Sequence, residues 1–553
     1  DNRIDLRLLP LSGVARVNVS SGPASIQYGA GTAGGVVEIL PTTDLRTKIT
    51  GELGSGGQQR IDGKTGFGSG NSQMFFAGGY WHQNGLVAVR GSRSDFAAPG
   101  SDLVTNSDRK QHNFMARFSH ETPSGDGVAV SLLYNDAAYG VSPEQGPNFD
   151  PNDSRYWRYP KSTYILTTVN GRLALSDNTT SELAVWRQSF DQNIHSFADD
   201  TYSVVEDIQE DDNDTYGART VIAYETDIQR FTVNGSALWS RHTQSEYEPV
   251  AGVGPDDVFT QQTFGVGADY MRKINDEMTA TIGAGYDVFD PKRTAGRQSA
   301  GRFTGVNAVA EINYSPAGDW QWRGSIGRRV RLPTMRELFG EAIGRFALNP
   351  DLRPEQTWQF EIAASYQLDN ASLQLVPFAS ITEDTLDQRR VMVGGNSLRQ
   401  RYNLNGTRTY GMEVQGEAQL SEKVSIDGSV TWNRHHVQRE TVDNSTRRLY
   451  LSDRPNWLAR LNASYQLGAQ TTFGLNVVYR GEAQSQDGNG DFQHVNASTQ
   501  LHVALRHNLL SAPDGSGVAL YVRADNLTYA FVEPQLGLPD QGRTLRFGLS
   551  ATL

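Results

Sequence analysis

GPASIQYGAGTAGGVVEIL, residues 22–40, is the stretch from which the fold of this chain can be inferred. It contains a G-x-G-x-x-G pattern that begins at Gly29, and such a pattern often cradles a phosphate between a strand and a helix. That interpretation requires a helix directly after the glycines, but the β-branched residues that follow from Val36 favour a strand. We therefore infer that the glycines are needed for the backbone conformation, because a residue without Cβ reaches positive φ and allows chain segments to approach closely. We expect a tight, irregular loop that leads into a strand enclosed by other structure.

Residues 16–40, RVNVSSGPASIQYGAGTAGGVVEIL, resemble the second half of the plug domain of TonB-dependent outer-membrane receptors. The resemblance implies an all-β fold, a 22-stranded antiparallel transmembrane β-barrel with a partial plug inside. It assigns residues 1–45 to the C-terminal part of the plug and 46–553 to the barrel. The family usually has a glutamate and an arginine where this chain has Asn18 and Ser21, and those charges hold the plug to the barrel wall. The residues assigned to the plug loop are Gly22, Pro23, Gly29, Gly31, Gly34 and Gly35.

Alternation of apolar and polar residues carries the barrel prediction independently of the resemblance. Residues 278–288 place Ile282 and Tyr286 on one face and polar or small residues on the other. Such segments run for about 10 residues, which suits a tilted strand crossing a bilayer, and aromatic residues bracket them. A soluble β-sandwich also alternates, but its strands are usually about 5 or 6 residues long. The expected strands are 47–55, 58–69, 72–83, 111–120, 126–139, 160–174, 180–195, 214–226, 229–246, 257–272, 276–289, 299–313, 318–331, 355–368, 371–388, 399–419, 423–438, 455–467, 470–484, 492–506, 516–528 and 541–553.

Connections between these strands are alternately short and long. The long ones include 140–159, 196–213, 332–354 and 439–454. Bacterial outer-membrane barrels have short periplasmic turns and long extracellular loops. The pattern therefore predicts a Gram-negative outer-membrane protein with these four segments outside the cell.

Composition excludes several other classes of protein. No apolar run approaches 18 residues, so no transmembrane helix is expected. The mean hydropathy of −0.50 does not argue against a barrel, because lipid-facing and lumen-facing residues average out. The chain has no cysteine, and its net charge of −12 disfavours nucleic acid as a partner. The first residues lack the pattern of a signal peptide, so we expect either that one has been removed or that more of the plug precedes Asp1.

A second segment, residues 331–362, reads RLPTMRELFGEAIGRFALNPDLRPEQTWQFEI. It resembles the conserved loop-and-strand region of vitamin, siderophore and haem receptors of the same family. Haem receptors of this type carry an iron-ligating histidine in this loop, and none occurs between Arg331 and Leu352, so haem is disfavoured. The alternative is that the prolines only make an irregular loop rigid.

Candidate ligand-binding residues come from this loop, the plug turn and an aromatic stretch before the strand predicted at 160–174. Aromatic residues at an interfacial belt are the alternative for the last group. No Ser-His-Asp or paired-carboxylate pattern is present, so an enzyme is not expected. The candidates are Tyr28, Arg331, Arg336, Glu337, Tyr156 and Trp157.

Metal-binding candidates are weaker. The segment 199–217 is strongly acidic, and clustered carboxylates suit calcium, although a solvated acidic loop is the simpler interpretation. His435 and His436 are adjacent on an expected strand and so point to opposite faces. Residues 487–491 begin like a calcium loop but lack its turn glycine, and we interpret them as a hairpin turn. The carboxylate candidates are Asp207, Asp211, Asp212 and Asp214.

The resemblance implies a receptor that imports a scarce solute, such as a siderophore, cobalamin or another metal chelate, without a required cofactor and with calcium as an option in the outer loops. The implied partners are the lipid bilayer and lipopolysaccharide, a small-molecule ligand, the TonB complex if an upstream plug half exists, and other outer-membrane or surface subunits. The alternative function is a receptor-derived barrel with a reduced plug that serves as a structural or secretion component. A plain diffusion porin is disfavoured by the plug segment and the number of strands.

Overall fold

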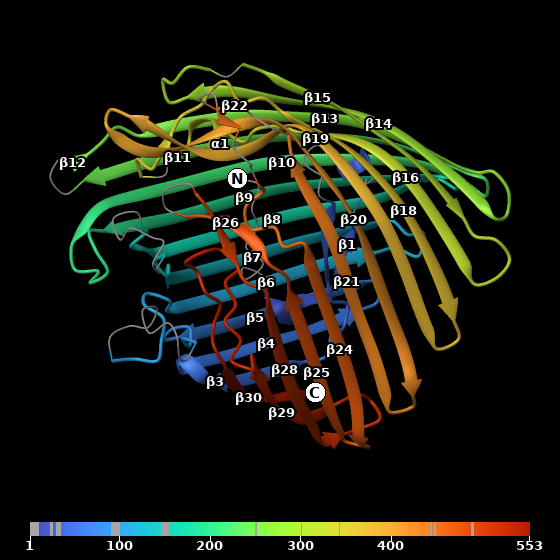
Figure 1. Cartoon of the computed structure of the whole chain (residues 1–553). Coiled ribbons are helices and arrows are strands. Elements are labelled where there is room, and N and C mark those ends of the chain that lie inside the picture. Colours follow the sequence, from blue (N-terminus) through green and yellow to red (C-terminus); the bar gives the residue numbers. More distant parts are fainter. Residues whose placement is uncertain are drawn as a thin grey trace.

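A closed ring of 22 long antiparallel strands forms the body of the molecule (Figure 1). The computed structural model describes residues 10–20, 22, 26–28, 35–89, 100–144, 154–248, 252–299, 301–341, 343–438, 441–442, 445–446, 450–487 and 491–553. Each long strand pairs with its neighbours in the sequence, and β3 pairs with β30 from Lys48↔Thr552 to Gly54↔Arg546. Within these ranges the sheet therefore has no free edge, which confirms the predicted closure.

The strands match the predicted spans one for one, with shifts at their ends. They are β3 (Lys48–Gly54), β4 (Gln58–Ser69), β5 (Ser72–Gln83), β6 (Arg109–Glu121), β7 (Gly127–Gly140), β8 (Trp157–Ser176), β9 (Thr179–Phe197), β10 (Val205–Thr226), β11 (Gln229–Glu248), β13 (Asp257–Lys273), β14 (Met278–Thr294), β15 (Phe303–Tyr314), β16 (Trp320–Arg331), β18 (Glu355–Leu368), β19 (Ala371–Val393), β20 (Asn396–Ser421), β21 (Val424–Val437), β24 (Trp457–Gly468), β25 (Thr471–Arg480), β28 (Ser498–Ser511), β29 (Gly517–Asp525) and β30 (Thr544–Thr552).

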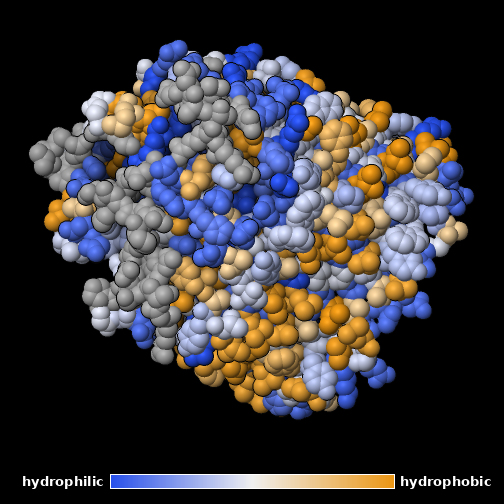
Figure 2. All heavy atoms as spheres, viewed as in Figure 1, coloured by the Kyte–Doolittle hydropathy of each residue, from blue (hydrophilic) through white to orange (hydrophobic). Residues whose placement is uncertain are grey.

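The two faces of the wall differ as the alternation predicts. On β14, Ile282 and Tyr286 point outward and are 61% and 44% exposed, whereas the neighbouring Asp287 points inward and is 5% exposed. Figure 2 shows apolar side chains gathered over the wall formed by β24, β25 and β28–β30. Aromatic clusters such as Trp320 with Trp322, ring centroids 5.6 Å apart, lie near the ends of the strands. This arrangement suits a hydrocarbon layer bounded by interfacial aromatic residues.

One end of the barrel carries short turns, such as Asp177–Asn178 between β8 and β9, and the other carries long connections, such as 332–354. We name them the turn end and the loop end. Near the loop end, one predicted loop and one predicted strand are wrong in their boundaries. The acidic segment is not a loop, because β10 begins at Val205 and stays paired with β9 and β11 through Asp214. The strand predicted at 470–484 ends at Arg480, and a separate hairpin of β26 (Ala483–Gln486) and β27 (Phe492–Val495) follows it, as expected for a turn at 487–491.

The N-terminal segment lies within the ring, where Figure 1 shows β1 behind the front strands. β1 (Val14–Ser20) pairs with β2 (Val36–Pro41), and each is near a short 3-10 turn, η2 (Leu11–Gly13) or η3 (Ile26–Tyr28). η2 contacts β4 and β5, and η3 contacts β11, β13, β14 and β15. A partial plug inside the barrel is thus confirmed.

The remaining elements are small. Within the described ranges α1 is the only α-helix, and no helix there is long and apolar enough to cross a membrane. These elements are η4 (Ser55–Gly57), β12 (Gly252–Val253), α1 (Met335–Phe339), β17 (Phe346–Ala347), β22 (Thr441–Val442) and β23 (Ser445–Thr446).

Candidate functional site

The connection between β16 and β18, residues 332–354, folds over the loop end as a structured element, which we call the cap loop. Its first turn is α1, which starts at a capping box: the Thr334 hydroxyl accepts a hydrogen bond from the Glu337 amide, and the Glu337 carboxylate accepts one from the Thr334 amide. These bonds satisfy backbone donors that a helix start leaves without partners.

Arg331, at the end of β16, joins the cap loop to the barrel wall. Its guanidinium donates to Glu337 in α1 and, at 3.1 Å, to Glu355 at the start of β18. Burial tends to raise the pKa of Glu337, but the hydrogen bonds from Thr334 and the charge of Arg331 outweigh it and hold the pKa below its usual value of 4.5. Arg331 and Glu337, both predicted to contact ligand, therefore hold the cap loop in place.

A hydrophobic core lies beneath the cap loop. Leu338, Phe339 and Leu352 are buried there, and Leu338 is 0% exposed. They pack against Phe289 of β14 and Phe259 of β13, whose ring lies 6.1 Å from that of Phe339. The leucine and phenylalanine positions of the 331–362 resemblance thus make a small core of their own, which supports the interpretation of that motif as structural.

The cap loop also docks on the long β19–β20 hairpin. β17 pairs in parallel with β20 at Arg399 and Gln400. The Arg401 guanidinium donates to the Arg336 carbonyl at 2.7 Å and lies 4.2 Å from the centre of the Phe346 ring. Asn349 donates to the Arg401 carbonyl at 2.9 Å. The loop is therefore fixed along one side of the mouth.

Across the mouth, the cap loop meets the aromatic stretch at the start of β8. The Arg345 guanidinium lies 5.6 Å from the centre of the Trp157 ring, and it donates to the Ser154 carbonyl at 3.3 Å. Six long strands, β9 to β11 and β13 to β15, separate β8 from β16 around the ring. The loop therefore spans part of the mouth, and the structure brings together two regions that the sequence nominated separately.

Below the cap loop, several strands turn polar and aromatic side chains into the lumen. Arg336 is exposed, and its charge is close enough to act on Tyr159 of β8 and His242 of β11. His242 lies 3.9 Å from the buried Asp211. We call Tyr159, Asp211, His242 and Arg336 the chamber residues. Sequence reasoning found Arg336 and Asp211, and its aromatic stretch before residue 160 includes Tyr159. It missed His242, whose only signal was an inward position near the loop end of a strand.

A second cluster continues the chamber wall onto β5, β6 and β7. The buried guanidinium of Arg109 lies between two rings, 5.4 Å from the centre of Trp81 and 5.0 Å from that of Tyr139. Tyr139 in turn stacks on Tyr159, with ring centroids 4.7 Å apart and an interplanar angle of 13°. Together these groups form a rigid surface that is both cationic and aromatic.

The other predicted ligand and plug residues are placed as follows. Tyr156 packs edge-on against Tyr202, with ring centroids 6.2 Å apart. Tyr28 ends η3, and its side chain lies outside the described residues, as do Pro23, Gly29, Gly31 and Gly34. Gly22 and Gly35 have positive φ, 81° and 112°, which glycine adopts readily.

The acidic candidates lie on β10, where alternation separates them. Asp211 is buried on the lumen side and accepts a hydrogen bond from Gln192 at 2.6 Å, whereas Asp214 pairs with Arg187 on the outer face. Asp207 shares the face of Asp211, and Asp212 shares that of Asp214, so the four cannot surround one ion. In the described part of the chain no group of three His, Cys, Asp or Glu side chains could hold a metal ion. Calcium in the outer loops stays a prediction. His435 and His436 point to opposite faces, as expected: His435 bonds Thr409, and His436 stacks on Tyr410.

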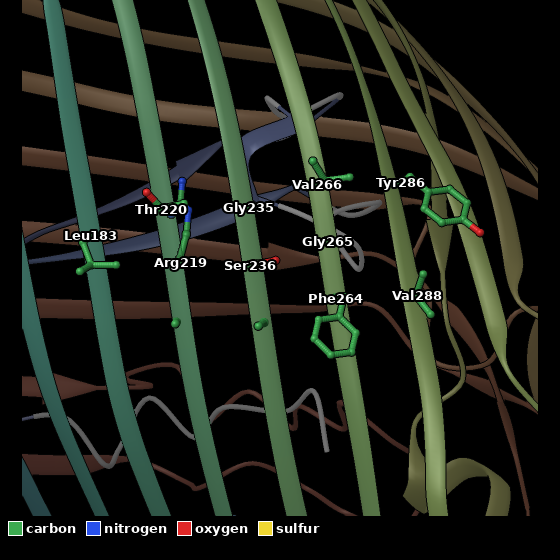
Figure 3. Close-up of a pocket in the computed structure, with 12 residues that line it drawn as sticks. Leu183, Arg219, Thr220, Gly235, Ser236, Phe264, Gly265, Val266, Tyr286 and Val288 are labelled. Carbon is green, nitrogen blue, oxygen red and sulfur yellow. The ribbon is translucent and has the colours of Figure 1, made fainter.

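Two cavities lie away from the mouth. A polar one of about 720 Å³ follows the inner wall of β18 to β24 and is lined by Gln374, Gln415 and Asn462, among others. The other, of about 400 Å³, is a groove on the outward face (Figure 3). Its floor includes the small cross-strand pair Thr220 and Gly235, and its sides include Leu183 and Phe264. Because these side chains face outward, this groove is no part of the chamber.

Comparisons with known proteins agree with this architecture. Residues 53–527 match the family described as TonB dependent receptor-like, beta-barrel. The structure resembles the copper transporter OprC, with a TM-score of 0.81, 14% sequence identity, and coverage of 98% of this chain and 88% of that chain. It also resembles the FrpB iron transporter from Neisseria meningitidis, with a TM-score of 0.77, 14% sequence identity, and coverage of 98% of this chain and 88% of that chain. For the siderophore receptor PiuA from Acinetobacter baumannii, the TM-score is 0.73 and the identity 15%, with coverage of 98% of this chain and 86% of that chain. At these identities the likeness to solved structures establishes the fold alone.

Proposed function

This chain belongs to the family of TonB-dependent receptors, which are outer-membrane proteins, and on that premise we propose that it imports a scarce solute of the siderophore, cobalamin or metal-chelate class. The solute is captured at the loop end, which faces the outside of the cell, and passes the plug with energy supplied through the TonB complex. The names of the similar structures, which include copper and iron transporters and a siderophore receptor, support this class of cargo.

The observation that carries the proposal is the contact between Arg345 and Trp157 across the mouth. A loop that only closed a hairpin would have no reason to reach a strand so far around the ring. Fixed on both sides, the cap loop holds Arg336 over the lumen, where a solute must pass to reach the plug. Binding groups held on a rigid scaffold lose little entropy when they take up a ligand.

The chamber residues suggest the chemistry of the solute. Arg336 offers an exposed guanidinium donor, and Tyr159 offers a hydroxyl group. Behind them, the buried Arg109 between Trp81 and Tyr139 makes the wall cationic and aromatic. Guanidinium groups favour oxygen anions, and aromatic faces favour planar ligands. An oxygen-rich, anionic chelate with aromatic or planar parts fits this set best. No enzymatic step is proposed.

Two measurements test the proposal. Native mass spectrometry of the protein purified from its own membranes would identify a co-purifying chelate or corrinoid. Uptake of radiolabelled iron chelates, copper and cyanocobalamin would then be compared in cells with and without TonB. We expect uptake of one of these solutes to require TonB and to fall at least about tenfold with Arg336→Ala or His242→Ala. Arg230→Ala, at the turn end, is the control and should leave uptake unchanged. Uptake of none of these solutes, or uptake indifferent to TonB, would contradict the proposal.

One observation favours a second candidate, a barrel with a reduced plug that serves as a structural or secretion component with other surface subunits. Asn18 stands where the family usually has a charge that holds the plug, and its amide bonds Glu38 within the plug instead, at 3.0 Å. A partner subunit in the mass spectrum, together with no TonB-dependent uptake, would favour this candidate.

A further inference from the structure

Ile26, in the plug turn η3, packs against a patch of the barrel wall that consists of glycines and so has no side chains. Gly267 of β13 and Gly285 of β14 are direct cross-strand partners, and Gly283 lies next to them on the same lumen-facing side. A methyl group at Gly283 or Gly285 would lie 2.9 or 2.7 Å from a carbon of Ile26, closer than carbon atoms can approach. Ile26 is 3% exposed, and its amide donates to Asp269 at 3.4 Å. We call these three glycines the glycine seat.

A second close contact between plug and wall has the glycine and the side chains on opposite partners. Here the plug provides the glycine, Gly13 in η2, and the wall provides the side chains. A methyl group at Gly13 would lie 3.1 Å from the Met115 sulfur and 3.3 Å from Ala77. Phe75 and Ala77, both on β5, are each 3% exposed. The plug therefore meets the wall by close fit at both places.

The two contacts lie in separate sectors of the ring, since β7 to β10 intervene between β6 and β11. β1 and β2 link them across the lumen. Among the described residues, one charged group close to the plug pairs within the wall: Glu361, which lies against Gly22, accepts from Arg323. Close packing of apolar groups, unlike attraction between charges, is not weakened by salt.

We propose that the glycine seat for Ile26 is the anchorage that positions this part of the plug, and that close packing of Ile26 against the three glycines is what holds it. Ile26 acts as a positioning residue, and the glycines set how deep it sits. This inference concerns how the plug is held and does not depend on which solute is imported.

Cysteine labelling tests the seat directly, because the chain contains no cysteine. Ile26→Cys places a thiol in the glycine seat, and Val19→Cys places one on the same hairpin at a position that is 73% exposed. In the folded protein, N-ethylmaleimide should label the first at least about tenfold more slowly than the second. Equal labelling rates would overturn the proposal.

Conductance in planar lipid bilayers tests the anchorage with variants that move side-chain volume from the plug to the barrel wall. Ile26→Ala removes packing and Gly285→Ala overfills the seat, so each should make large openings at least about tenfold more frequent. The double variant, which returns a methyl group to the space that Ile26 vacates, should approach the wild type. Gly51→Ala, where an added methyl group meets nothing within 4 Å, is the control. The proposal fails if both single variants stay closed, if the double variant is no better than either, or if 1 M salt opens the wild type as much as Ile26→Ala does.

Discussion

The guanidinium of Arg345 lies over the indole ring of Trp157, 5.6 Å from its centre, although the two residues are 188 positions apart and their flanking strands are separated by six others. This contact fastens the free side of the cap loop, whose other side is already fixed on the β19–β20 hairpin. The cap loop therefore covers part of the mouth, and the chamber residues of the barrel wall, Tyr159, Asp211 and His242, lie beneath it.

Trp157→Ala should release the far side of the cap loop. A cation–π contact contributes about 0.5–2 kcal/mol, so amide hydrogen exchange in residues 343–349 should quicken by about two- to thirtyfold. Arg187→Ala is the matched control, because it removes a contact of the same length, 5.6 Å from the centre of the Tyr216 ring, on the outer face of the wall. Unchanged exchange in the Trp157 variant would mean that the cap loop does not depend on this contact.

Arg331→Met should loosen the base of the cap loop more strongly. It leaves Glu337 and Glu355 largely buried without a counter-charge, and such losses cost about 2–4 kcal/mol. Hydrogen exchange of residues 335–341 measures this effect, and barrel strands such as β14 should keep their protection. If the loop stayed as protected as in the wild type, the two ion pairs would be dispensable.

Acid should release the cap loop through Glu337. Because its pKa in the folded protein lies below 4.5, this carboxylate contributes its full stabilisation above about pH 4.5, and the contribution is lost as the pH falls through the lower, folded value. Protection of residues 334–340 against hydrogen exchange, corrected for the intrinsic rate, should therefore fall as the pH drops below about 4.5. In Glu337→Gln the same step should be absent, and a step of equal size there would assign it to another group.

Leu338→Ala should unfold the core of the cap loop without preventing the barrel from forming. Leu338 is fully buried, and truncating such a side chain costs about 2–5 kcal/mol. We expect normal amounts of folded barrel in the membrane, rapid proteolysis within residues 335–352 and reduced uptake of solute. Loss of the barrel itself would show that the cap loop is required for assembly.

The assignment of outward and inward faces can be tested with two single variants that each introduce an arginine, at adjacent positions of β14. Ile282→Arg puts a charge on the outward face, at a cost of about 2–4 kcal/mol if the position is deep in the bilayer. Thr281→Arg puts the same charge into the lumen and should be tolerated. The amount of folded protein in the outer membrane compares them, and equal amounts would contradict the assigned orientation of β14.

The sequence alone determined the barrel. Hydrocarbon on one side and a lumen on the other impose a period of two on each strand, and this signal is local, so segments such as 278–288 display it without knowledge of their neighbours. It failed at Val205–Asp214, because runs of carboxylates resemble loops, whereas in the structure pairing with β9 and β11 on both sides continues the strand.

Only the tertiary structure decided which residues meet. Tyr159 and His242 look like any inward polar residues until the cap loop places Arg336 near them. The sequence marked the plug glycines, but nothing in it linked Ile26 to Gly267, 241 positions away. Such contacts form because the closed ring of strands brings distant segments together. The sequence pattern of a single segment carries no information about which other segments the ring will place beside it.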